Sequence, residues 1–70
     1  MYDYSKLKGR IVEMRMTQTD LAVKIQMAKS TLNLKLNNKI SFSQDDIIAV
    51  SKELLIPKDE IGIYFFTEIV

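Results

Sequence analysis

The chain has 70 residues, of which 47% are hydrophobic and 27% charged, and it contains neither cysteine nor histidine. It therefore forms no disulfides and lacks the usual zinc ligands and the most common general base. With two glycines and one proline, the composition predicts a folded, helix-rich single domain over residues 1–70. We expect no metal, no cofactor and no catalytic residue.

Membrane association and export are also not expected. No apolar run approaches the roughly 18 residues of a membrane span. The first eight residues lack the apolar stretch of a signal peptide. We therefore expect a cytoplasmic protein with no membrane partner.

The charge is small overall but unevenly distributed along the chain. The net charge is +1, yet residues 1–40 hold eight basic and three acidic side chains, whereas residues 41–70 hold two basic and six acidic ones. Between Val23 and Phe42 there are four lysines and no acid. Such a basic stripe is typical of a nucleic-acid-binding face, although a window of this length also lacks acids by chance.

The first predicted helix begins near Asp3 or Ser5, either of which can cap it, and runs to about Met14. Leu7, Ile11 and Met14 recur at the spacing of one helical face.

The second predicted helix begins at Thr17, whose hydroxyl and the Asp20 carboxylate have the spacing of a capping box. Its inward face is formed by Leu21, Ala22 and Ile25. A break follows at about residues 26–28.

The third predicted helix spans about Lys29–Leu36, with Leu32 and Leu36 facing inward together. Asn37 and Asn38 tolerate the left-handed conformation and indicate its end.

The fourth predicted helix begins at Ser43, where Asp46 completes a second capping box, and ends at Pro57. Its predicted buried side consists of Ile47, Ile48, Val50, Leu54 and Leu55. A short fifth helix is predicted over about Lys58–Ile63.

The tail Tyr64–Val70 is aromatic and β-branched, and it predicts a short extended strand. Two roles for it stay open. The aromatic residues either dock onto the protein's own core or form the interface of a homodimer, in which a small core gains stability from a partner.

Two short helices joined by a three-residue turn, the second one basic, are typical of a helix-turn-helix motif, although an ordinary helical hairpin has the same outline. The run from Thr17 to Asn37 resembles the Cro and repressor family of phage helix-turn-helix proteins. The segments at residues 2–11, 36–39, 42–47 and 61–66 are similar to small Cro-like regulators of phages and prophages of Gram-positive bacteria.

This resemblance implies an all-α, compact five-helix domain of the lambda-repressor type, with its helix-turn-helix at about residues 17–37. It implies a sequence-specific DNA-binding transcriptional regulator, a Cro-like repressor of a phage lysogeny switch. Its partner would be double-stranded operator DNA, with the recognition helix in the major groove of each half-site.

The resemblance also implies a role for individual residues. Positions that face base edges in the family correspond to Lys29, Ser30, Asn33 and Leu34. Lysine can donate hydrogen bonds to guanine, and asparagine can bond to adenine. Serine can bond to different bases, and leucine can pack against the thymine methyl group. Positions that contact the DNA backbone correspond to Gln18, Thr31, Lys35, Asn38 and Lys39.

For each of these residues a purely structural role is the alternative. The lysines also suit an ordinary solvated surface, and Ser30, Asn33 and Gln18 also suit a helix that must stay in water. Leu34 equally suits the hydrophobic core.

The turn departs from the family pattern at two positions. Gln26 stands where the family usually has glycine, and Ala28 stands where it prefers a serine or threonine cap. Each departure costs on the order of 1 kcal/mol, so the register of the base-facing residues depends on how the turn folds.

A second function fits the same sequence. The acidic half from residue 41 onward and the unusual turn also suit a modulator or antirepressor that binds the opposing phage repressor. DNA contact by the chain alone would then be weak or absent.

Overall fold

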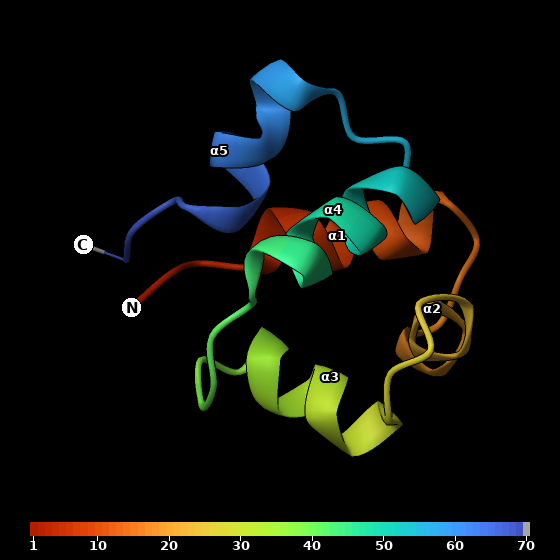
Figure 1. Ribbon diagram of the computed structural model, residues 1–70. Coiled ribbons are helices and arrows are strands. Elements are labelled where there is room, and N and C mark those ends of the chain that lie inside the picture. The colour runs from red at the N-terminus through yellow and green to blue at the C-terminus, as the bar shows by residue number, and fades with distance from the viewer. Residues whose placement is uncertain (70) are drawn as a thin grey trace.

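The computed structural model describes residues 1–69 and contains five α-helices and one short 3-10 helix (Figure 1). In chain order they are α1 (Ser5–Glu13), α2 (Gln18–Lys24), α3 (Lys29–Leu36), α4 (Gln44–Glu53), the 3-10 helix η1 (Lys58–Glu60) and α5 (Ile61–Phe65). The predicted all-α, five-helix architecture is therefore confirmed. Each helix within residues 1–69 falls short of the length and apolar content that crossing a membrane requires.

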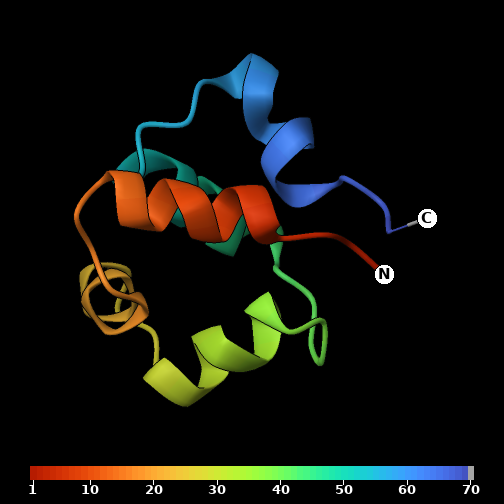
Figure 2. The same ribbon diagram turned by 180° about the vertical axis from the view of Figure 1, so that it is seen from behind.

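Helices α1 and α4 occupy the middle of the molecule, with α5 on one side and α2 and α3 on the other (Figures 1 and 2). Helix α2 packs against both α3 and α4, and α1 packs against α5. The Arg10 side chain joins α1 to the end of α4, because its Nε donates to the Leu54 carbonyl oxygen at 2.9 Å.

One hydrophobic core connects these helices. Leu7, Val50 and Leu54 are fully buried, and every α-helix contributes at least one buried side chain. The remaining buried apolar residues are Tyr4, Ile11, Leu21, Ala22, Leu32, Leu36, Ile56 and Phe65.

The sequence signals for two helix starts are confirmed in detail. Thr17 caps α2 and Ser43 caps α4, and each hydroxyl accepts a hydrogen bond from the backbone N–H three residues later. The carboxylates of Asp20 and Asp46 bond back to the N–H of the cap residue, which completes both capping boxes.

Helices α1 to α4 all end on a non-glycine residue in the left-handed conformation. These residues are Arg15 (φ 59°), Gln26 (φ 56°), Asn38 (φ 61°) and Leu55 (φ 54°). After each of the four helices, this residue and its successor donate their N–H groups back to helix carbonyls, as in a Schellman motif. A side chain in this conformation costs about 1–2 kcal/mol. Both glycines lie inside helices instead, and neither has positive φ.

The two chain ends lie side by side and are joined to the loop after α3. Tyr2 and Glu68 form an antiparallel bridge, and the Asp3 N–H donates to the Thr67 carbonyl oxygen at 2.7 Å. The Asn38 amide then bonds Tyr2 twice, accepting from its N–H at 2.9 Å and donating to its carbonyl oxygen at 2.7 Å. We call this pair of bonds the Asn38 clamp.

Two predictions about buried residues of the fourth helix are wrong. Ile48 is 55% exposed because it lies about 120–160° around α4 from the inward row of Val50 and Leu54. Leu55 is 68% exposed because it follows the C-cap Leu54, and its left-handed conformation turns the chain away from the helix.

The predicted C-terminal strand is also wrong in part. Tyr64 and Phe65 belong to α5, and residues 67–69 form no named strand but an isolated bridge and backbone hydrogen bonds to residues 1–3. Val70 lies outside the described residues. The burial of Phe65 supports docking of the tail aromatics onto the protein's own core, while the homodimer stays a prediction.

Substitution of Leu55 by glycine should raise the free energy of unfolding by about 1 kcal/mol. The exposed leucine contributes little packing, and glycine relieves the left-handed conformation. Chemical denaturation measures the change. The same substitution at Leu34, which is exposed but inside α3, should lower stability by about 1 kcal/mol.

Asn38→Gly should lower the free energy of unfolding, whereas Leu55→Gly should raise it, although both substitutions relieve the same left-handed backbone conformation. Asn38→Gly removes both bonds of the Asn38 clamp, which together contribute about 1–3 kcal/mol. We expect a net loss of stability, together with faster hydrogen exchange at the Tyr2 amide. A gain in stability equal to that of Leu55→Gly would show that the clamp contributes nothing.

Candidate binding surfaces

The turn between α2 and α3 forms a helix-turn-helix without the expected glycine. Gln26 adopts the left-handed conformation at the position where the Cro and repressor family usually has glycine. Its N–H donates to the Val23 carbonyl oxygen at 3.1 Å, and the Met27 N–H donates to the Ala22 carbonyl oxygen at 2.8 Å. Ala28 is the N-cap of α3 and supplies no side-chain bond. Gln26 thus adopts a conformation that is unfavourable for a residue with a side chain, and α3 lacks a side-chain cap. The predicted bounds of α3, Lys29–Leu36, are nevertheless confirmed.

Helix α3 turns one face to the core and the opposite face to solvent. Leu32 and Leu36 are buried, and α3 packs against α2, where the small Ala22 is also buried. The exposed face consists of Lys29, Ser30, Asn33, Leu34 and Asn37. At about 100° per residue, these five positions share less than half of the helix circumference. The four predicted base-facing residues therefore lie together on one exposed face, and Leu34 is 42% exposed rather than part of the core.

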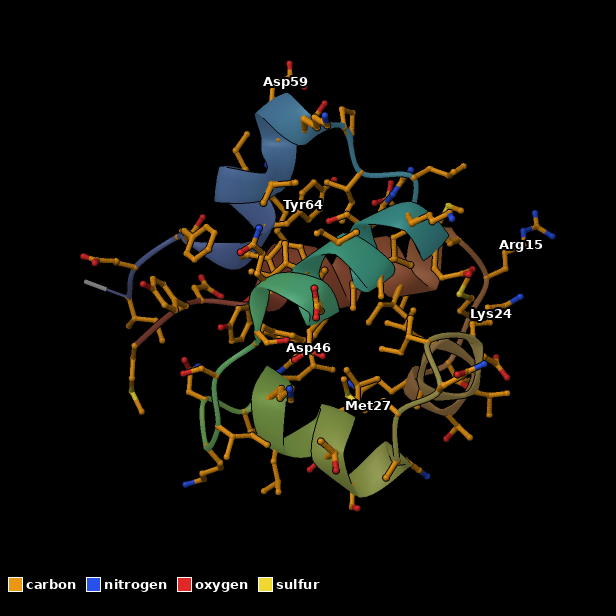
Figure 3. All side chains as sticks on the ribbon, in the orientation of Figure 1. Arg15, Lys24, Met27, Asp46, Asp59 and Tyr64 are labelled. Carbon is orange, nitrogen blue, oxygen red and sulfur yellow. The ribbon has the colours of Figure 1, made fainter. Side chains whose placement is uncertain are left out.

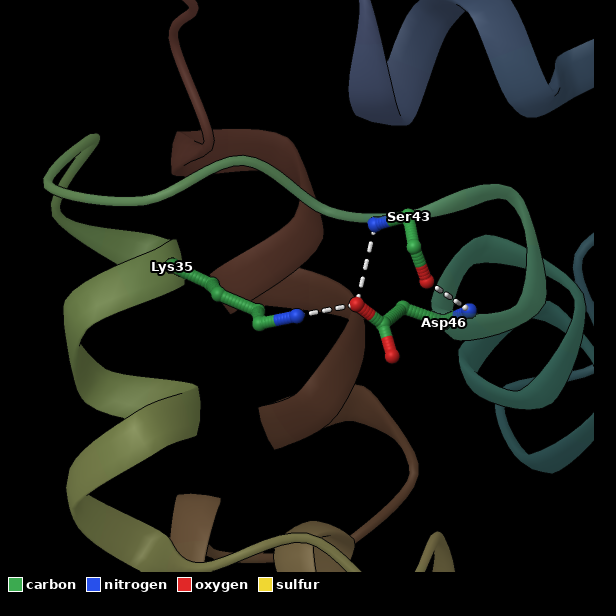
Figure 4. A network of polar contacts seen from close by, with 3 residues as sticks. All are labelled: Lys35, Ser43 and Asp46. Carbon is green, nitrogen blue, oxygen red and sulfur yellow. Dashed lines mark hydrogen bonds and ion pairs between the residues drawn. The ribbon is translucent and has the colours of Figure 1, made fainter.

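Lys35 lies on the other side of α3 and is paired with Asp46. Figure 4 shows its ammonium group bonded to Oδ2 of Asp46, which also accepts from the Ser43 backbone N–H at 2.9 Å. The two side chains of the ion pair are only 12% and 18% exposed. Lys35, predicted to contact DNA phosphates, is thus engaged within the protein and links α3 to the start of α4.

The surroundings of Asp46 keep it ionised. Partial burial acts to raise the pKa of Asp46, but the hydrogen bonds from Lys35 and Ser43 outweigh it and hold this pKa below the ordinary value of 3.8. Asp46 is therefore ionised at neutral pH.

The other residues predicted to contact the DNA backbone differ in their exposure. Lys39 is exposed, whereas Gln18, the first residue of α2, and Thr31 are half-buried. Asn38 uses both its amide nitrogen and its amide oxygen in the Asn38 clamp. The exposed face of α3 and the following loop therefore keep two unpaired cations among the described residues, Lys29 and Lys39.

A second surface lies beside the loop after α3, where a pocket of about 440 Å³ opens between the chain ends and residues 38–42. We call it the terminal groove. Its lining is mixed, and Asn38, Lys39 and Ser41 supply polar groups to it. Its apolar lining includes Met1, Tyr2, Ile40, Phe42, Phe65 and Phe66. Three of these stay in contact with water, since Met1 is 83%, Phe66 50% and Ile40 43% exposed.

Edge-to-face aromatic contacts order the walls of the terminal groove. Ring centroids are 5.6 Å apart for Tyr2 and Phe66, 5.3 Å for Tyr4 and Phe42, and 5.4 Å for Phe42 and Phe65. Such pairs contribute about 0.5–1.5 kcal/mol each beyond burial. One side of the groove is therefore an ordered aromatic wall, and the Asn38 clamp connects it to the end of α3.

Sequence reasoning did not identify the terminal groove, the Asn38 clamp or the Lys35–Asp46 pair. A capping box at Asp46 was visible in the sequence, but nothing in the spacing indicates a partner eleven residues earlier. Within residues 1–69, no group of three or more acidic side chains is arranged to hold a metal ion.

A protein family described as "Protein of unknown function (DUF739)" matches residues 1–68. The chain belongs to this family. The DUF739 chain is also similar to a solved structure, the solution structure of the modulator of repression (MOR) of the temperate bacteriophage TP901-1 from Lactococcus lactis. The two are 37% identical, the match covers 93% of this chain and 88% of that one, and the TM-score is 0.81. No curated protein matches the sequence.

These similarities agree in part with the resemblance found from sequence. The similar structure belongs to a phage regulator, as expected, but it is a modulator of repression and not a Cro protein.

Asp46→Asn should lower the stability of this DUF739 chain at neutral pH by about 1–3 kcal/mol, because it leaves the half-buried Lys35 charge unpaired. A carboxylate whose folded pKa is lowered stabilises the fold above its unfolded pKa, and this contribution is lost as pH falls through the folded value. The variant should therefore lose less stability than the parent on acidification below pH 3.8. Thermal unfolding across pH tests both effects.

The control for this experiment is Asp45→Asn, at the exposed neighbouring position in the first turn of α4. It should change stability by at most about 1 kcal/mol, the size of a helix-dipole effect. Equal losses in both variants would mean that the Lys35–Asp46 pair has no special importance.

Proposed function

We propose that this chain is a phage or prophage regulator that binds the repressor protein of the same genetic switch and thereby modulates repression. The observation that carries this proposal is the similarity to the phage modulator of repression over 93% of the chain. The proposed role is one of binding and not of catalysis, and it would be carried out in the host cytoplasm.

The charge on α3 supports a protein partner over DNA. Sequence-specific DNA-binding proteins commonly neutralise about 6–10 phosphates, most of them with lysine and arginine. Here Lys35 is neutralised by Asp46, so Lys29 is the one cation on the exposed face of α3. A helix with so little free charge gains little from the phosphate backbone.

The terminal groove supports the same conclusion. Exposed apolar patches with aromatic side chains are typical of protein–protein interfaces, where such residues supply most of the binding energy. Phe66, which belongs to the aromatic wall of the groove, is 50% exposed, and Ile40 is 43% exposed. We propose that the repressor docks in the terminal groove and covers these side chains.

The second candidate function is sequence-specific operator binding by the chain itself. It is favoured by one observation: the base-facing positions Lys29, Ser30 and Asn33 lie together on the exposed face of α3. The partner would then be operator DNA, read in the major groove, with two copies of the chain on two half-sites.

The decisive experiment combines operator gel shifts with calorimetry, using the repressor encoded in the same switch. The chain alone should show no operator preference between about 50 and 200 mM salt, whereas it should bind the purified repressor and change the repressor's own gel shift. Salt-dependent, sequence-specific binding by the chain alone would favour the second candidate. In that case Asn33→Ala should relax specificity at one base pair by about 1–3 kcal/mol, and Lys39→Ala should weaken all sequences alike.

Ile40→Asp should weaken repressor binding about tenfold or more, because it replaces an exposed apolar side chain in the lining of the terminal groove by a charge. Ile48→Asp is the matched control, since Ile48 is 55% exposed and does not line the groove. Circular dichroism should show both variants folded. Equal affinities for the two variants would exclude the terminal groove as the docking surface.

A further inference from the structure

A second pocket, of about 450 Å³, lies at the corner where α1 leads into α2. We call it the corner pocket. It is lined by Met14, Arg15, Met16, Asp20, Val23 and Lys24. None of these residues belongs to the terminal groove or to the exposed face of α3, so neither function considered above uses this surface.

The apolar part of the corner pocket is adaptable. Met14 and Met16 are half-buried against the core, and Val23 is 72% exposed. Methionine side chains are unbranched and polarizable, so they adjust to apolar partners of different shape. An apolar side chain seated here would remove the exposed Val23 surface from water.

The charged part of the corner pocket is positive. Figure 3 shows Arg15 and Lys24 extending outward at the same corner of the molecule, and both residues are exposed. Among the described residues neither forms an ion pair.

The acid in the pocket, Asp20, is already engaged elsewhere. Its carboxylate accepts a hydrogen bond from the Thr17 backbone N–H at 2.8 Å, at the start of α2, although it lies one helical turn before Lys24. Asp20 keeps its negative charge, so the corner pocket presents two cations and one carboxylate, a net charge of +1, around an apolar floor.

We propose that the corner pocket binds an acidic peptide segment of a protein partner, with an apolar side chain against the two methionines and carboxylates on Arg15 and Lys24. Charge complementarity selects the acidic partner and sets its orientation. The apolar floor selects a peptide over DNA, because a phosphate backbone has no apolar side chain to place there. This surface is separate from the terminal groove, so the inference goes beyond the proposed function and does not depend on it.

The test is a titration of the full chain, labelled at its methionine methyl groups, with a synthetic peptide of about ten residues that alternates glutamate and leucine. We expect shifts of the Met14 and Met16 methyl signals, and binding that weakens as salt is added. The double variant Arg15→Gln, Lys24→Gln should weaken binding about tenfold or more, whereas Lys29→Gln, an exposed lysine outside the pocket, should leave it unchanged. The unchanged methyl spectrum of the free variants shows that they are folded.

Three results would overturn the inference. The first is the absence of methyl shifts at Met14 and Met16, and the second is equal binding of a peptide in which glutamine replaces glutamate. The third is that a short DNA duplex shifts these signals and the peptide does not, which would assign Arg15 and Lys24 to phosphate contacts. Repressor binding is measured separately in the Ile40→Asp experiment, so failure of one proposal does not affect the other.

Discussion

The left-handed residue at the end of each of the helices α1 to α4 is the constraint on which the rest of this structure depends. Arg15, Gln26, Asn38 and Leu55 each turn the chain away from the preceding helix, and none of them is glycine. Each turn directs the next segment onto the same small core. The cost of about 1–2 kcal/mol at each position is offset by the Schellman hydrogen bonds and by burial of the helices that it directs.

Three of these helix ends also determine the candidate surfaces. Arg15 lies where α1 ends and brings its cation to the corner pocket. Gln26 sets the turn that presents the exposed face of α3 to solvent. Asn38 ends α3 and also holds Tyr2 beside the terminal groove. A glycine at positions 15 or 38 would relieve the backbone strain but remove the side chain that each surface uses.

The Lys35–Asp46 pair reduces the free positive charge of the basic segment between Val23 and Phe42. Four lysines without an acid over twenty residues indicate a nucleic-acid-binding face as long as all four are free. Once Lys35 bonds to Asp46, the exposed face of α3 keeps a single cation and an exposed leucine. A motif typical of DNA binding then suits recognition of a protein surface, which is consistent with the similarity to a phage modulator of repression.

Local sequence by itself determined most of the helices. The capping boxes at Thr17 and Ser43 and the periodic apolar residues predicted the bounds of α1 to α3 and the start of α4 closely, because these signals act over a few neighbouring residues. They also predicted which side of α3 is exposed. The predicted end of the fourth helix at Pro57 is wrong, because α4 already ends at Glu53, before the left-handed Leu55. The sequence did not reveal that Leu55 lies outside the core or that Tyr64 and Phe65 are helical, since both depend on where the chain reverses after α4.

Only the tertiary structure decided which of the predicted site residues are free to bind a partner. Lys35 and Asn38 have the chemistry of DNA contacts, but Asp46 and Tyr2 engage them from eleven and thirty-six residues away. The terminal groove likewise forms only when both chain ends meet the loop after α3. Hydrogen bonds, ion pairs and grooves of this kind depend on distances in the folded chain, and spacing along the sequence does not contain those distances.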